Sequence, residues 1–173
     1  MSSLLFLASV IKYFAIAIGV GAVTLSTVNF FIFLSDGTLD KDERHLIATA
    51  HLLIRLAILV VLLTLLPEIL CYHQTVGIAY LDAVILGELF VLFLLSLNAL
   101  LLTAGIIPAV MAPVMQVSGW YALGMLNILQ FSGATEFSFL LFMLAFVTWF
   151  IFVAAVVNGI LAYLRAKQQK MLH

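Results

Sequence analysis

The chain has 173 residues, of which 66% are hydrophobic and only 9% charged, and its formal net charge is −1. A soluble chain of this length cannot cover so much apolar surface with so few charges, so the composition excludes an ordinary water-soluble domain. The sequence has no basic run typical of nucleic-acid binding, and its single cysteine, Cys71, excludes an intrachain disulfide framework. We therefore expect one integral membrane domain surrounded by the lipid bilayer.

The first apolar stretch covers residues 4–34 and is longer than a helix needs to cross a hydrocarbon core about 30 Å thick. Lys12 near its start is typical of an interfacial anchor, because a lysine reaches the headgroups from an apolar helix. We predict a first span at about 14–34, with Lys12 at the membrane surface.

The polar segment 35–43 separates the first stretch from the second. Gly37 suits the position after a helix end, and Thr38 or Asp40 suits the cap of a following helix. This pattern predicts a tight turn between two antiparallel helices. The second span is predicted at about 45–66 and is expected to end at Pro67.

The third span is predicted at about 77–107. Segment 109–134 contains one proline and three glycines, so we predict an interfacial or re-entrant helix there, with Trp120 near the headgroups. The last span is predicted at about 136–164, with Thr135 as its N-cap.

These elements predict an all-α bundle of four transmembrane helices in one domain, 1–173, with an interfacial or re-entrant segment before the last helix. Four crossings place both termini on one side of the membrane. Arg165 and Lys167 lie in the polar tail on that side, so the positive-inside rule favours cytoplasmic termini.

Charged side chains inside a span are costly and need a partner or a water-filled cavity. Arg55 and Glu88 lie about 14 Å from opposite faces of the bilayer, so they reach similar depths in antiparallel helices. We predict an Arg55–Glu88 pair, which either fixes helix register or forms a proton- or ion-coupled site. Lys12 and Asp82 both fall near the termini, where they either pair or reach the interface independently.

His51 lies one turn before Arg55 on the same helical face and is expected to face the bundle interior. It is a candidate axial ligand for haem or a pigment, and a hydrogen-bonded interior histidine is the alternative. A bis-histidine haem needs a second histidine at similar depth. The other histidines, His45, His73 and His173, are predicted near helix ends or in loops.

Small residues spaced four apart occur twice in the first span, as Ala15-x-x-x-Gly19 and Ala17-x-x-x-Gly21. They allow another helix to approach closely, which fits internal packing and oligomerisation equally. The sequence contains no Gly-rich phosphate loop, nucleophile elbow or HExxH motif. We therefore expect no enzymatic activity and assign no catalytic or metal-binding residue.

Three stretches resemble small bacterial membrane proteins of the copper-resistance-protein-D-like kind. They are HLLIRLAILVVLLTLL (51–66), GELFVLFLLSLNALLLTAGIIP (87–108) and SGATEFSFLLFMLAFVTWF (132–150). The resemblance covers about half the chain and implies a helical bundle in a bacterial-type inner membrane, with redox or metal handling. The chain lacks the lysine expected early in the third span, where Glu88 stands, and the paired histidines of haem-binding relatives.

Three functions are consistent with these features. The first is a non-enzymatic subunit whose helices pack in a homo-oligomer or a larger membrane complex. The second is proton- or ion-coupled transport through Arg55, Glu88 and His51. The third is a redox membrane protein that binds haem or a pigment at His51.

Overall fold

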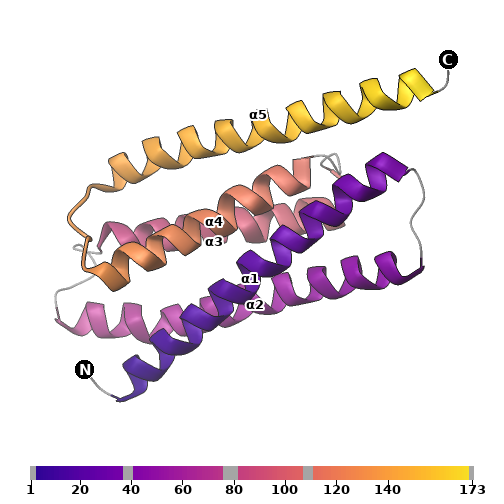
Figure 1. Cartoon of the computed structure of the whole chain (residues 1–173). Coiled ribbons are helices and arrows are strands. Elements are labelled where there is room, and N and C mark those ends of the chain that lie inside the picture. The colour runs from indigo at the N-terminus through magenta and orange to yellow at the C-terminus, as the bar shows by residue number, and fades with distance from the viewer. Residues whose placement is uncertain (1–2, 37–40, 76–81, 107–110, 172–173) are drawn as a thin grey trace.

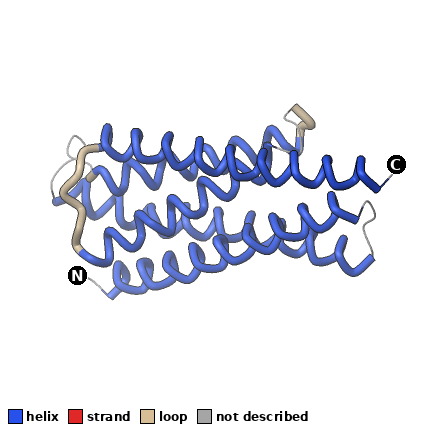
Figure 2. Tube along the Cα trace, turned by 45° about the horizontal axis from the view of Figure 1, so that its top comes forward, coloured by secondary structure: helices blue, strands red, loops and turns tan. Residues whose placement is uncertain are grey.

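The computed structural model describes residues 3–36, 41–75, 82–106 and 111–171, and these contain five α-helices and no strand (Figure 2). The helices are α1 (Ser3–Asp36), α2 (Lys41–Thr75), α3 (Ala83–Thr103), α4 (Met111–Ser132) and α5 (Phe139–Met171). Consecutive helices run in opposite directions along one bundle, so the two chain ends lie at opposite ends of the molecule (Figure 1). This places the termini apart, whereas the sequence predicted them together.

Four helices, α1, α2, α3 and α5, are long and apolar enough to cross a membrane, which confirms the expected helical membrane bundle. The antiparallel packing of α1 and α2 is also confirmed (Figure 1). Gly37, Thr38 and Asp40, predicted to shape the turn between them, lie outside the described residues. Because α1 begins at Ser3, Lys12 lies about 14 Å inside the helix and not at its start.

The second helix continues through Pro67 to Thr75, so the prediction that Pro67 ends it is wrong. Membrane helices tolerate internal proline because neighbouring helices and side-chain hydroxyls satisfy the backbone group that it frees. The continuation matters for the site, since it carries Glu68 into the bundle on α2 instead of leaving it in a loop.

The third helix is shorter than predicted and begins after an N-cap. The Asp82 side chain accepts a hydrogen bond from the backbone N–H of Val84, at 3.4 Å, and the helix starts at Ala83. It ends at Thr103 because Gly105, with φ of +69°, closes its last turn in the left-handed region. Glu88 is therefore only about 8 Å from the start of α3.

The segment predicted to hold an interfacial or re-entrant helix forms the continuous 22-residue helix α4, which is not among the four helices named above as candidate membrane spans. Pro113 does not interrupt it because the backbone N–H groups of a first helical turn have no acceptor within the helix. Trp120, expected near the headgroups, is fully buried. Helix α4 contacts α1, α3 and α5 and is about 33 Å long.

The last helix begins after Ser138, not after Thr135. The Ser138 hydroxyl accepts a hydrogen bond from the backbone N–H of Leu141, at 3.2 Å, as an N-cap side chain does. The helix then continues to Met171, beyond the predicted end at residue 164.

Glycines bring α4 close to two of its neighbours. A Cβ atom at Gly19 of α1 would collide with the six-membered ring of Trp120 on α4. A Cβ atom at Gly119 would lie 2.7 Å from a methyl carbon of Leu95 on α3, which is closer than real contacts allow. One of the two small-residue patterns in α1 therefore serves internal packing, with α4 in the centre of the bundle.

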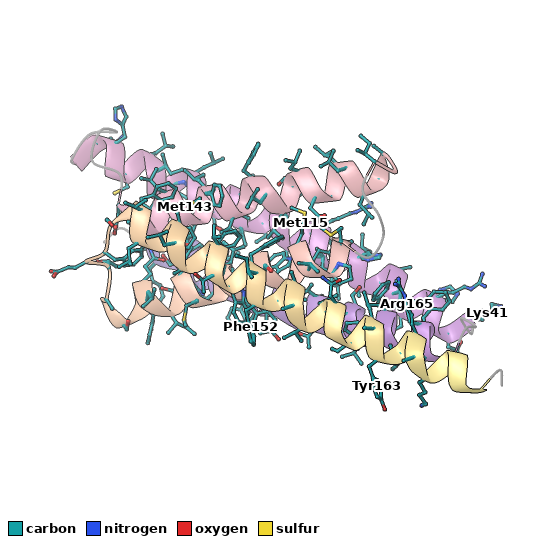
Figure 3. The ribbon with its side chains drawn as sticks, turned by 90° about the horizontal axis from the view of Figure 1, so that it is seen from above. Lys41, Met115, Met143, Phe152, Tyr163 and Arg165 are labelled. Atoms are coloured by element: carbon teal, nitrogen blue, oxygen red, sulfur yellow. The ribbon has the colours of Figure 1, made fainter. Side chains whose placement is uncertain are left out.

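The outer surface is mostly apolar along its length, and most of the basic residues lie at one end. Bulky exposed side chains cover α1, α2 and α5, as a lipid-facing surface requires. Lys41 at the start of α2 and Arg165 near the end of α5 lie at the same end of the bundle (Figure 3). Tyr163, 69% exposed, projects away from the bundle near that end.

Candidate functional site

Lys12 is the centre of a buried polar cluster to which four helices contribute. Its ammonium nitrogen lies 2.8 Å from Glu68 Oε2 on α2 and 2.9 Å from Gln130 Oε1 on α4. Both carboxylate oxygens of Glu88 on α3 lie 3.2 Å from the same nitrogen. Lys12 and Glu88 are fully buried. We name these four residues the Lys12 cluster.

Local backbone features place each partner. Glu68 directly follows Pro67, and its Oε1 also lies 3.4 Å from the hydroxyl of Ser9, one turn before Lys12. Beside Glu88, a Cβ atom at Gly87 would lie 3.1 Å from Leu126 of α4 and 3.2 Å from an aromatic carbon of α5. The absence of that atom lets α3 approach both helices next to the carboxylate.

The charges of the Lys12 cluster do not balance when all its groups are ionised. One ammonium group faces two carboxylates and one neutral amide. Excess charge inside a protein that is surrounded by hydrocarbon is costly, because no water is available to solvate it. The cluster is therefore most stable when it also holds one more positive charge, for which a proton on a carboxylate is the simplest carrier.

The two carboxylates differ in access. The Glu68 side chain keeps 11% of its surface exposed, whereas that of Glu88 is completely enclosed. Glu68 is therefore the more accessible of the two carboxylates, and both contact the same ammonium group. This arrangement suits a site that takes up and releases protons from one end of the bundle.

The predicted Arg55–Glu88 contact is wrong, because Lys12 is the ion partner of Glu88. The depth estimate failed since the third span was assumed to start six residues before Ala83. Arg55 is exposed on α2 and faces a groove against α3. Asp82 caps α3, so its suggested pairing with Lys12 is not formed.

His51 is half-buried on α2, one turn before Arg55. His45 and His73, on the same helix, are exposed, and His173 lies outside the described residues. No group of three or more histidine, cysteine or acidic residues suited to a metal occurs in the described part of the chain. No second histidine faces His51 there, so the described residues offer no bis-histidine pair for haem, and binding of haem or a pigment stays a prediction.

Sequence reasoning missed Glu68 and Gln130 as members of the site. Glu68 follows a proline that was taken as a helix end, and Gln130 lies in the segment expected to remain at the interface. The available signal was the rule that a buried carboxylate needs a cation. Glu88 was correctly expected to need one, but Lys12 was placed at the membrane surface.

A second group of buried polar atoms lies away from the Lys12 cluster, on α3 and α4. The amide nitrogen and oxygen of Asn98 and the hydroxyl of Ser118 are buried and have no hydrogen-bond partner among the described residues. Both side chains are fully buried. Unpaired polar groups in an interior are costly, so these positions are suited to internal water.

A wide apolar groove of about 700 Å³ lies between α4 and α5. Its lining includes Met125, Phe142 and Trp149 and is almost free of polar surface. In a bilayer such a surface is filled by acyl chains, so it requires no ligand other than lipid.

Comparison with known proteins gives no further assignment. No protein-family model matches the chain, and no curated protein or solved structure shows significant similarity to it.

Proposed function

We propose that this chain is a proton-coupled membrane transport protein that binds and releases a proton at the Lys12 cluster. The observation that carries the proposal is the enclosed Lys12 ammonium group, which is shared by the carboxylates of Glu68 and Glu88. A purely structural pair needs one carboxylate for one ammonium group. The additional carboxylate supplies a site for an exchangeable proton.

The path that we propose begins at the partly exposed Glu68 and continues to the enclosed Glu88. Beyond Glu88, the unpaired polar atoms of Asn98 and Ser118 offer positions for water further along α3 and α4. Asn98 follows Glu88 by ten residues, or about 15 Å along the helix. Protons cross such a distance only through bound water, so transport requires hydration of this inner region.

The test is proton flux into liposomes that contain the full chain and an internal pH-sensitive dye, driven by a potassium diffusion potential. Glu88→Gln leaves one carboxylate for one ammonium group, and its amide still accepts a hydrogen bond from Lys12. We expect this variant to fold and to lose flux by about tenfold or more. Glu136→Gln, at an exposed loop position, is the matched control and retains flux.

Flux in the Glu88→Gln variant equal to that of the unchanged protein would contradict the proposal. Flux through the unchanged protein no faster than through empty liposomes would contradict it as well. If Glu88→Gln fails to fold, Glu68→Gln serves as the second variant, because Glu68 lies at the more accessible edge of the cluster.

A second candidate function is that of a helix-packing subunit in a homo-oligomer or a larger membrane complex. One observation favours it: Ala17 and Gly21 form a small-residue pattern on the exposed face of α1, with open space beside Gly21. Ala155 and Gly159 repeat the pattern on the exposed face of α5. These faces admit a helix of a second copy or of another membrane protein.

For this second function, the mass of the protein in mild detergent is the measurement. Gly21→Leu is expected to shift an oligomer towards monomer, whereas Ala48→Leu, which introduces the same side chain on the exposed face of α2, is not. A monomeric mass for the unchanged protein would remove this candidate without affecting the proton site.

A further inference from the structure

Arg55 is an unpaired cation on the apolar helix α2. It lies eleven residues, about 17 Å, beyond Arg44, which begins the candidate membrane span of that helix. Among the described residues no carboxylate lies within ion-pair distance of its guanidinium group. The acidic residues at depth, Glu68 and Glu88, both bind Lys12. A guanidinium group at this depth is costly unless an anion or water lies beside it, and no described carboxylate fills that place.

The groove beside Arg55 has the chemistry of an anion site. It has a volume of about 380 Å³ and lies between α2 and α3, with Ser96 and Thr103 as its other polar lining residues. Ser96 makes no hydrogen bond to another described residue, and the Thr103 hydroxyl donates to the backbone oxygen of Ala99 at 2.8 Å. The lining therefore offers a guanidinium fork and the Ser96 hydroxyl as donors, and no carboxylate.

The lengths of the helices give the groove an opening towards one membrane surface. Helix α3 has 21 residues and α2 has 35, so α3 is about 21 Å shorter. The α3 end that carries Thr103 lies short of the ends of α2 and α5 (Figures 1 and 2). A charged group can therefore enter the groove at the end of α3 that carries Thr103. From there it reaches Arg55 along the groove, which extends about 10 Å from Thr103 to Ser96.

We infer that the Arg55 groove binds a phosphate group, from a lipid headgroup or from a free phosphate-bearing solute. Arginine suits this ligand because its planar fork donates two parallel hydrogen bonds to phosphate oxygens. The hydroxyl group of Ser96 supplies a further donor beside Arg55. The inference does not depend on proton binding at the Lys12 cluster, because Glu68, the α2 member of that cluster, lies thirteen residues, about 20 Å, beyond Arg55 along the helix.

The test is thermal unfolding of the purified full chain in a neutral detergent with two kinds of probe. Phosphatidylglycerol is compared with a diacylglycerol that has the same acyl chains and no phosphate. Inorganic phosphate is compared with chloride at equal ionic strength. Each probe is applied to the unchanged protein, to Arg55→Gln, and to Arg44→Gln as an exposed basic control on the same helix.

We expect a phosphate-bearing probe to raise the unfolding midpoint of the unchanged protein and of Arg44→Gln, and not that of Arg55→Gln. A shift with phosphatidylglycerol alone identifies a lipid headgroup, and a shift with inorganic phosphate identifies a free solute. Arg55→Gln removes an unpaired charge from the span, so the variant is expected to fold. Equal shifts in all three proteins, equal loss in both variants, or no shift with either probe would overturn the inference.

Discussion

Lys12 has three ammonium hydrogens, and groups from three other helices receive them. One points to Glu68, one is shared by the two oxygens of Glu88, and one points to Gln130. The hydrogen-bonding capacity of the ammonium group is thus fully used without water. Loss of this one side chain would leave two carboxylates and an amide oxygen facing each other in the interior.

Replacement of Lys12 by methionine is therefore expected to destabilise the fold strongly. Removal of one partner of a buried ion pair costs about 3–5 kcal/mol, because the remaining charge is left uncompensated. Lys167→Met, at an exposed position near the end of α5, is the control and should change little. The measurement is unfolding in detergent followed by circular dichroism.

The combined variant Lys12→Met, Glu68→Gln and Glu88→Gln removes both the cation and the two anions. It should recover part of the lost stability, because the cost arises from unpaired charge and not from lost volume. If Lys12→Met unfolds like the control, the ammonium group does not hold the four helices together.

At the scale of helices, α4 determines the arrangement. Its buried side includes Gln116, Ser118 and Gly119, and small or polar residues there lower the hydropathy of the segment. These residues contact other helices rather than lipid, so the usual hydropathy signal of a membrane span is weak. Hydropathy reports contact with lipid, whereas α4 is held mainly by protein contacts.

The same reasoning explains which parts of the fold could be predicted from the sequence. The apolar spans and the α1–α2 hairpin were predictable because lipid contact and turn residues leave local signals. The sequence could not predict that α2 continues through Pro67 or that Lys12 is the partner of Glu88, because both depend on tertiary contacts. The exact depth of Lys12 depends on where α1 begins, and no capping pattern marks that start.

The contact between α1 and α4 gives a second prediction. Its control is a second glycine on the same helix, two residues further along the chain. Gly19→Ala places a methyl group against the Trp120 ring, and overpacking of this kind costs about 1–3 kcal/mol. Gly21→Ala meets open space and should be neutral or stabilising by up to about 1 kcal/mol. Unfolding midpoints in detergent measure both, and equal midpoints would contradict the close α1–α4 approach.

At the scale of the whole molecule, five of the seven lysines and arginines lie at one end of the bundle. Apart from Lys12 and Arg55, every lysine and arginine belongs to the start of α2 or the end of α5. They are Lys41, Arg44, Arg165, Lys167 and Lys170. These two segments share one end of the bundle (Figures 1 and 3). The positive-inside rule then favours a cytoplasmic location for the basic end, and a five-helix crossing places the N-terminus on the opposite side.

Labelling of single cysteines with a membrane-impermeant maleimide distinguishes five crossings from four. In a Cys71→Ala background, cysteines replace Ser3, Asp42, Glu136 or Lys167, all at exposed positions near helix ends. If α4 crosses, positions 3 and 136 react from one side, and positions 42 and 167 react from the other. If α4 is re-entrant, position 3 pairs with 167, and position 42 pairs with 136.

We expect the five-crossing pattern, because α4 is about 33 Å long and runs between helices that each span the apolar region. Figure 1 shows α4 running alongside α3, which is a candidate membrane span of nearly the same length, so α4 is expected to cross where α3 does. Intact cells and inverted vesicles supply the two orientations for labelling, and the basic end should react in inverted vesicles alone. The re-entrant pattern of labelling would move α5 to the other orientation and place both termini together.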